Sequence, residues 1–332
     1  MLEFLTLLPL LLAPSEPVET DPVITPAEFQ ASFDLARAGK LAIPENIKDG
    51  ALRYRYVFVG GFLNEGMSQY FKQNARELRA LGVPRAAIHY IYPSSHESVE
   101  GNADLVQGNF LKIAGEGPEK LVVIAHSRGA CDALAFALQN PEFVSARVEA
   151  LFLLQGPFGG TGVADYVTGE GPPIDDSLPF PHRVVALALG RLEESKLAHG
   201  KHGGLTALTR RASRAYWEAA LKENQAAIKV VGPKTFYVTT KTKPSHLRLF
   251  LKATSFYLGA HFGPNDGMVA LDDQAVTGLG TVLAVLDAGH TDLTHRFPSA
   301  LPNRRLRRAL IDAIVMAVGR RVPNERTLSD PR

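Results

Sequence analysis

The sequence is almost without cysteine: Cys131 is the single one in 332 residues, so no internal disulfide can form. It also lacks an excess of either charge, because 36 Lys and Arg against 34 Asp and Glu give a formal net charge of +2. That value is too small to indicate a nucleic-acid or anionic-membrane partner. The most apolar run, at residues 4–13, is too short to span a bilayer, because a membrane-spanning helix needs about 20 residues. What is left is an ordinary globular composition, 45% hydrophobic and 21% charged.

The N-terminal part does not share the pattern of the main domain. Residues 1–13 resemble the apolar core of a secretory signal, which favours an extracytoplasmic location, but Glu3 precedes the run and no small-residue cleavage site follows. A tail packed on a cytoplasmic domain is the alternative. Residues 14–50 are interpreted as an extension: a Pro-rich acidic linker, a helix with Thr25 as N-cap and Glu28 in a capping box, and a connector at 43–50.

From residue 51 to 325, strand and helix patterns alternate. Such alternation predicts an α/β domain with a mostly parallel central sheet flanked by helices. The pattern fails at about 157–230, which we interpret as an inserted helical cap. Its apolar helical face at 205–220 either packs permanently on the core or covers the mouth of a site. Residues 326–332 form a tail. The predicted strands are 53–59, 87–92, 120–125, 148–155, 235–240 and 281–286, and the main predicted helices are 69–81, 103–113, 128–138 and 306–318.

A strand–turn–helix at residues 120–138 carries the sequence Ala-His-Ser-Arg-Gly at 125–129. This pattern is typical of a nucleophile elbow centred on Ser127, because small residues two before and two after the serine let strand and helix approach. The backbone N–H of Arg128, at a helix N-terminus, can bind an anionic intermediate, and its side chain is interpreted as solvated. The Gly-Gly turn after the first core strand offers the N–H of Phe62 as a second donor, with a plain strand-to-helix turn as the alternative explanation of those glycines. His126 is interpreted as a structural histidine.

A serine nucleophile needs a general base and an orienting carboxylate. His290 directly follows the last predicted strand, which makes it the predicted base, with His295 as the alternative. Asp266 lies in a Gly-rich loop upstream and is the predicted acid, with Asp287 as its rival. An arginine-rich stretch at 304–308 is interpreted as a solvated helix face.

At these motifs the sequence resembles the secreted triacylglycerol lipases of the Pseudomonas and Burkholderia type. Residues 59–62 (VGGF) stand at the oxyanion turn, 125–129 at the elbow, 265–269 (NDGMV) at the acid and 290–292 (HTD) at the base. The resemblance implies an α/β-hydrolase fold, ester hydrolysis on lipid-like acyl chains and a helical lid. Asp292 matches a calcium ligand of these lipases, but residues 245–264 contain no Asp or Glu, so we expect neither a metal nor a cofactor.

The sequence therefore predicts a serine hydrolase that cleaves carboxylic esters through an acyl-enzyme. An acyltransferase or thioesterase could use the same triad, and a non-catalytic binding protein on a hydrolase scaffold is the alternative of another class. The expected partners are small-molecule or lipid esters, with transient contact to a lipid surface through the cap and no nucleic acid. The oligomeric state stays open.

Overall fold

A parallel sheet organises the molecule. The computed structural model describes residues 24–62, 69–173, 203–295 and 302–320, and its six-stranded sheet has the order β2-β1-β3-β4-β5-β6 with every neighbouring pair parallel. The predicted strands agree with the observed ones to within three residues. The strands are β1 (Arg55–Val59), β2 (Ile88–Ile91), β3 (Leu121–His126), β4 (Val148–Leu154), β5 (Thr235–Lys241) and β6 (Thr281–Asp287).

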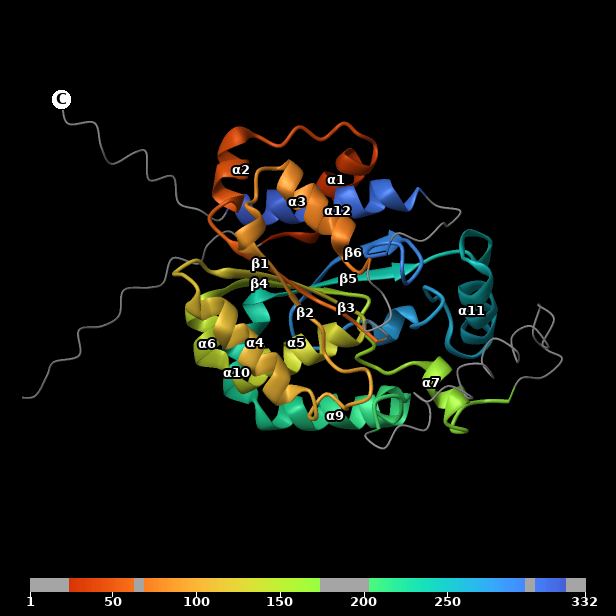
Figure 1. The fold of residues 1–332 in the computed structure, drawn as a ribbon. Coiled ribbons are helices and arrows are strands. Elements are labelled where there is room, and N and C mark those ends of the chain that lie inside the picture. The colour runs from red at the N-terminus through yellow and green to blue at the C-terminus, as the bar shows by residue number, and fades with distance from the viewer. Residues whose placement is uncertain (1–23, 63–68, 174–202, 296–301, 321–332) are drawn as a thin grey trace, which may run out of the picture.

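Helices cover both faces of this sheet, as Figure 1 shows. One face carries α1 (Pro26–Arg37), α2 (Glu45–Ala51), α3 (Lys72–Ala80) and α12 (Asn303–Gly319), and the other carries α4 (Ala103–Gly115), α5 (Arg128–Gln139), α6 (Pro141–Arg147), α9 (Arg210–Glu223) and α10 (Gln225–Val231). Beyond the carboxyl ends of the strands lie α7 (Gly162–Val167) and α11 (Leu249–Phe262). Short 3-10 turns occupy Arg85–Ala87, Thr206–Leu208, Gly232–Lys234, Pro244–His246 and Leu271–Asp273.

Because helices cover both faces of the sheet, its strands are unbroken apolar runs in the sequence. Along β1, Tyr56 and Phe58 face one buried cluster, whereas Val57 and Val59 face the other. All four side chains have no exposed surface. Alternate residues of a strand point to opposite faces, so a strand buried on both sides needs apolar residues at every position.

The N-terminal extension packs onto the domain. Thr25 caps α1 as predicted, since its hydroxyl accepts the Glu28 backbone N–H at 3.3 Å, and Phe29 is buried against the core. The predicted connector at 43–50 was wrong, because most of it forms α2. A side chain at Gly50 would come within 2.4 Å of the Gly319 carbonyl oxygen, so this helix lies directly against the end of α12. Residues 1–13 and 326–332 lie outside the described residues, and within those that are described no helix is long and apolar enough to cross a membrane.

The insertion at 157–230 is described on either side of residues 174–202. In its second part, Trp217 of α9 is only 5% exposed, with its ring centroid 5.2 Å from that of Phe158. Phe158 in turn contacts Tyr237 of β5, with centroids 5.4 Å apart. The apolar side of α9 therefore packs on the core, which was the first of the two interpretations of this helix.

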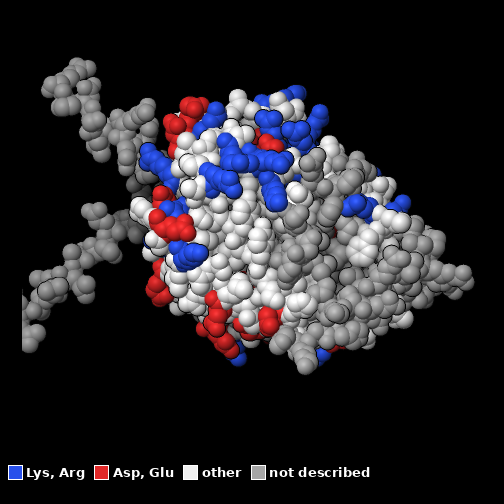
Figure 2. All heavy atoms as spheres, in the orientation of Figure 1, with Lys and Arg blue, Asp and Glu red and all other residues white. Residues whose placement is uncertain are grey.

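The small net charge conceals a local concentration of positive charge. Figure 2 shows Lys and Arg side chains gathered over α3 on the face turned toward the viewer. Lys72, Arg76, Arg79 and Arg85 line a groove at this place together with aromatic residues of the β2 edge. The sheet edge at β2 is therefore bordered by cations.

Candidate active site

The turn from β3 into α5 has the geometry of the predicted elbow. Ser127 adopts φ 54° and ψ −132°, a left-handed conformation that costs a non-glycine residue energy. The backbones around it are in close contact: a Cβ at Gly129 would lie 2.2 Å from the Gly60 carbonyl oxygen, and one at Gly61 would lie 2.8 Å from the Ser127 Cβ. The small residue two after the serine is therefore required sterically, as the sequence argument expected, and the facing turn requires one at Gly61 as well.

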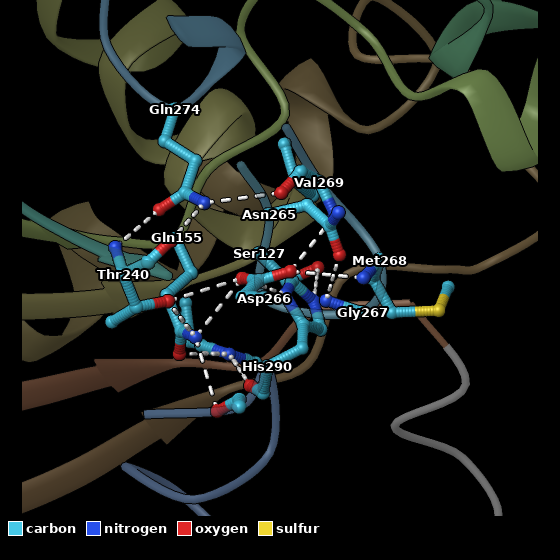
Figure 3. A network of polar contacts seen from close by, with 12 residues as sticks. Ser127, Gln155, Thr240, Asn265, Asp266, Gly267, Met268, Val269, Gln274 and His290 are labelled. Atoms are coloured by element: carbon cyan, nitrogen blue, oxygen red, sulfur yellow. Dashed lines mark hydrogen bonds and ion pairs between the residues drawn. The ribbon is translucent and has the colours of Figure 1, made fainter. Parts of the chain in front are cut away.

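The structure brings Ser127, His290 and Asp266 together in one hydrogen-bonded chain, seen in Figure 3. The Nε2 atom of His290 is 2.9 Å from the Ser127 Oγ, and its Nδ1 is 2.8 Å from Asp266 Oδ2. Ser127 follows β3, His290 follows β6, and Asp266 lies in the loop after α11. All three residues are buried, and Asp266 has no exposed surface.

Both oxygens of the Asp266 carboxylate are hydrogen-bonded. Oδ1 accepts the backbone N–H groups of Met268 at 2.9 Å and Val269 at 2.8 Å. Oδ2 accepts, besides His290, the Thr240 hydroxyl at 3.2 Å. Both oxygens thus have donors without solvent, and these donors fix the plane of the carboxylate relative to the imidazole.

Gln155, directly after β4, is a site residue that the sequence analysis missed. It is fully buried and has a positive φ of 52°. Its Nε2 donates to Asp266 Oδ2 at 3.0 Å and to the Thr240 hydroxyl at 2.6 Å. A glutamine at a strand end is unremarkable in sequence, so only the fold reveals this contact.

His126 is buried in the packing of the elbow, as expected of a structural histidine. Its Nε2 lies 2.8 Å from the His290 carbonyl oxygen, and its Nδ1 lies 2.5 Å from the Tyr70 hydroxyl. Burial, with a smaller contribution from His290, lowers the pKa of His126 well below its usual range. The ring is therefore neutral at pH 7.

The two predicted oxyanion residues lie beside Ser127. Arg128 is the first residue of α5, so its backbone N–H belongs to the helix-end donors that have no acceptor within the helix. Phe62 lines the same cavity as Ser127. The interpretation of the Arg128 side chain as solvated was wrong: it is 2% exposed, and its guanidinium donates to the carbonyls of Ser95, at 3.2 Å, and Glu97.

A second arginine also departs from expectation. Arg307, taken as part of a solvated face, is 1% exposed. Its guanidinium donates to the Asp292 carbonyl at 3.2 Å and to the His295 carbonyl, and to the Gln73 side chain at 2.8 Å. It therefore ties the segment after His290 to α3.

The rival base and acid occupy other places. The ring of His295 packs against that of Tyr70, with centroids 4.0 Å apart, and burial lowers its pKa to about 3. Asp287 is half exposed and accepts the Thr242 hydroxyl at 2.5 Å. The hydrogen bonds described for these residues do not include one to Ser127 or, for Asp287, to His290.

Asp292, the residue matched to a calcium ligand, accepts the Gly289 backbone N–H at 2.9 Å. This bond closes the loop that presents His290. Among the described residues no group of three or more His, Cys, Asp or Glu side chains could bind a metal ion, and the expectation that the protein needs no metal stays a prediction.

A cavity of about 450 Å³ opens above Ser127. Its apolar wall comes mainly from the start of α11, where Leu249 is 69% and Phe250 39% exposed. No residue of α9 borders it, so among the described elements it is α11 that places apolar side chains at the mouth. The lining consists of Phe62, Tyr70, His126, Ser127, Arg248, Leu249, Phe250, Leu251, Met268, His290, Thr291 and His295.

Comparison with known proteins bears on the fold. No family model matches the chain, and no curated protein sequence matches it. Among solved structures, a metagenomic carboxyl esterase is similar with a TM-score of 0.58 at 20% identity, over 80% of this chain and 76% of that one. The mature lipase of Bacillus licheniformis is similar with a TM-score of 0.54 at 18% identity, over 71% of this chain and 84% of that one. The chain therefore has the α/β-hydrolase fold, as predicted.

Proposed function

We propose that the protein hydrolyses carboxylic esters through an acyl-enzyme formed on Ser127. The observation that carries the proposal is the continuous hydrogen-bonded chain from the Ser127 Oγ through His290 to Asp266. A buried carboxylate facing Nδ1 requires a proton there, so Nε2 is left as the acceptor that faces the serine hydroxyl. The free enzyme is thereby poised for proton transfer.

In the first half-reaction, the Ser127 Oγ bonds to the ester carbonyl carbon while its proton passes to His290 Nε2. Collapse of the tetrahedral intermediate breaks the bond to the alkoxy oxygen, and the same proton leaves with the alcohol. Water then attacks the acyl-enzyme, again through His290, and releases the acid and Ser127. Asp266 stabilises the imidazolium in each half-reaction without accepting its proton.

Negative charge on the carbonyl oxygen of the intermediate needs preorganised donors. We assign this role to the backbone N–H groups of Arg128 and Phe62. Two features support the assignment: Arg128 is at the N-terminus of α5, where the helix dipole favours an anion, and the Gly61 backbone lies against Ser127, so the turn that carries Phe62 borders the nucleophile.

The cavity wall supports a proposal for the substrate class. Leu249, Phe250, Met268 and Phe62 present apolar surface beside the nucleophile, which suits an acyl chain better than a charged group. The similar solved structures are an esterase and a lipase by name, which is consistent with this choice. We therefore propose esters of apolar acyl chains, and the start of α11 as the part that meets a lipid surface. Lipase specificity of the Pseudomonas and Burkholderia type belongs to the same proposal.

The direct test compares Ser127→Ala with Ser213→Ala, which removes a buried hydroxyl on α9. Wild type and the Ser213 variant should hydrolyse p-nitrophenyl esters and react with a fluorophosphonate probe, whereas the Ser127 variant should do neither and still fold. Residual labelling of the Ser127 variant at another serine would contradict the assignment. Product analysis with an added alcohol or thiol tests hydrolysis against acyl transfer, because a transferase would form the new ester or thioester in preference to free acid.

A further inference from the structure

A hydrogen-bonded chain that the proposed reaction does not itself use starts at the glycine turn beside Ser127. The Gly61 backbone N–H donates to the Tyr70 hydroxyl at 2.9 Å, and that hydroxyl lies 2.5 Å from the Nδ1 of His126. Tyr70 is 2% exposed and His126 1% exposed. Both side chains are therefore held by their surroundings.

The directions of these bonds follow from donor and acceptor counting. The His290 carbonyl can only accept, so the Nε2 of His126, 2.8 Å away, must carry the ring proton. Because the ring is neutral, its Nδ1 is an acceptor. The Tyr70 hydroxyl accepts from Gly61 and donates its own proton to that Nδ1. One tautomer of His126 satisfies every contact.

At its far end the chain divides toward both partners of the nucleophile. His126 donates to the backbone carbonyl of His290, and its Nε2 is also 3.2 Å from Gln155 Oε1. Gln155 donates to Asp266 and, at 3.2 Å, to the Gly289 carbonyl. The turn that precedes Phe62 is thus connected through buried side chains to the loops that carry the base and the acid.

We propose that Tyr70, acting through Gly61 and through His126, is the positioning residue that sets the Phe62 N–H and the His290 backbone relative to Ser127. The proposal rests on the proposed hydrolase function. Tyr70 borders the cavity, but the bonds of its hydroxyl run to Gly61 and His126, so we assign its effect to geometry. The oxygen of the tetrahedral intermediate needs its donors within a few tenths of an ångström. In the turn, the Gly60 backbone N–H donates to the Ile91 carbonyl at 2.9 Å, and the Tyr70 hydroxyl holds the next residue, Gly61, whose backbone has the wide conformational freedom of a glycine.

The test is Tyr70→Phe, which removes one oxygen and keeps the ring that packs on Phe71 and His295. We expect kcat for a p-nitrophenyl ester to fall by about 10- to 100-fold, somewhat less than the loss of a whole oxyanion donor, with KM changed less than about twofold. Affinity for an alkyl boronic acid, whose adduct with Ser127 mimics the tetrahedral intermediate, should fall by the same factor as kcat.

Tyr56→Phe is the matched control. Tyr56 is also fully buried, and its hydroxyl donates to the Ala51 carbonyl at 3.0 Å, near the start of β1 and away from the carboxyl ends of the strands. This variant should lose similar thermal stability and keep wild-type kcat, KM and boronate affinity. Equal kinetics in the two variants, or a Tyr70 variant that changes KM while its boronate affinity stays at the wild-type value, would overturn the proposal.

A second measurement does not depend on catalysis. In protein labelled with ¹⁵N-histidine, His126 should show a protonated Nε2 and an unprotonated, hydrogen-bonded Nδ1 at pH 7, and the Nδ1 shift should move in the Tyr70→Phe variant. A protonated Nδ1 or a cationic ring would overturn the proposal at any level of activity. Failure of the proposed function is recognised separately, because wild-type protein would then not react with the fluorophosphonate.

Discussion

Asp266→Asn is the substitution whose outcome the structure constrains most closely. The change keeps the size of the side chain but replaces one oxygen by an NH₂ group. In the wild type one carboxylate oxygen accepts two backbone N–H groups, from Met268 and Val269. The other accepts side-chain donors of His290, Gln155 and Thr240. Either orientation of the new amide turns its NH₂ toward groups that donate.

The two orientations differ in how well their surroundings can adapt. Facing Met268 and Val269, the NH₂ meets two backbone donors that cannot change, at about 1–3 kcal/mol for each buried donor left without an acceptor. Facing His290, it meets a ring that can move its proton to Nε2 and a Thr240 hydroxyl that can rotate, so Gln155 alone stays in conflict. The second orientation leaves one buried donor without an acceptor instead of two, and it should therefore be the more stable one.

That choice determines the kinetics. With its proton on Nε2, His290 can no longer accept the proton of Ser127, so kcat should fall on the order of 10³–10⁴-fold. Stability should fall by only about 1–3 kcal/mol, measured as a shift in the urea midpoint. The ¹⁵N spectrum of His290 should show the changed tautomer directly.

Asp287→Asn serves as the control, because its half-exposed carboxylate lies three residues before His290 and contacts Thr242 instead. We expect a change in kcat below about twofold for this variant. If Asp287→Asn abolished turnover while Asp266→Asn left kcat within tenfold of wild type, the carboxylate would be wrongly assigned. A large loss with an unchanged His290 tautomer would refute the orientation argument.

Three further predictions follow from the cavity, the buried histidines and the elbow. For esters from acetyl upward, kcat/KM should rise by up to about fourfold per methylene until the cavity is full, because each buried CH₂ contributes about 0.8 kcal/mol. Phe250→Ala should flatten this chain-length series, whereas Trp217→Ala should not. A flat series for the wild type would contradict the proposed acyl site. Burial lowers the pKa of His295 to about 3 from 6.5, so the unfolded state binds the extra proton between these values and wild-type stability is lost as pH falls from about 6.5. In urea titrations, a His295→Gln variant should lose up to about 1.4 kcal/mol less per pH unit across that window, and parallel pH profiles would exclude the effect. Gly129→Ala should destabilise the protein by roughly 1–3 kcal/mol through its clash with the neighbouring backbone. Gly108→Ala, in open space inside α4, should instead stabilise it by about 0.5–1 kcal/mol. Thermal melts measure both changes, and two variants whose melting temperatures shift in the same direction would contradict this prediction.

The layered fold was predictable because its signals are local and repeated. Each buried strand is an apolar run, and Thr25 with Pro26 marks a helix start that the structure reproduces. The strand order could not be predicted, since β1 lies between β2 and β3 only through contacts that are distant in sequence. The helix at Glu45–Ala51 was missed because Gly and Asp within it argue against a helix, and its close contact with α12 outweighs that propensity.

The sequence left open whether the 205–220 helix packs on the core or covers the mouth of the site, for a physical reason. α9 separates apolar from charged residues along its length, and that pattern indicates a helix with one buried side, without saying what buries it. In α11 apolar residues occur all round, so no face stands out in sequence, yet Leu249 and Phe250 remain exposed. An exposed apolar turn beside a cavity is visible only once the fold is known.

The residues around the proposed triad show why chemistry could be predicted from sequence while positioning could not. Ser127, Asp266 and His290 stand in motifs because their reactive groups must meet at fixed points. Gln155 belongs to no sequence motif, but its position in the fold explains why a glutamine stands there. It must donate to Asp266 and accept from His126 with one side chain, and a carboxamide has both functions on a single planar group. A glutamate there would set a second negative charge beside Asp266 and raise the cost of ionising either group, and a leucine would remove a donor from the carboxylate. Glutamine is therefore selected by its contacts to both sides, which only the assembled fold defines.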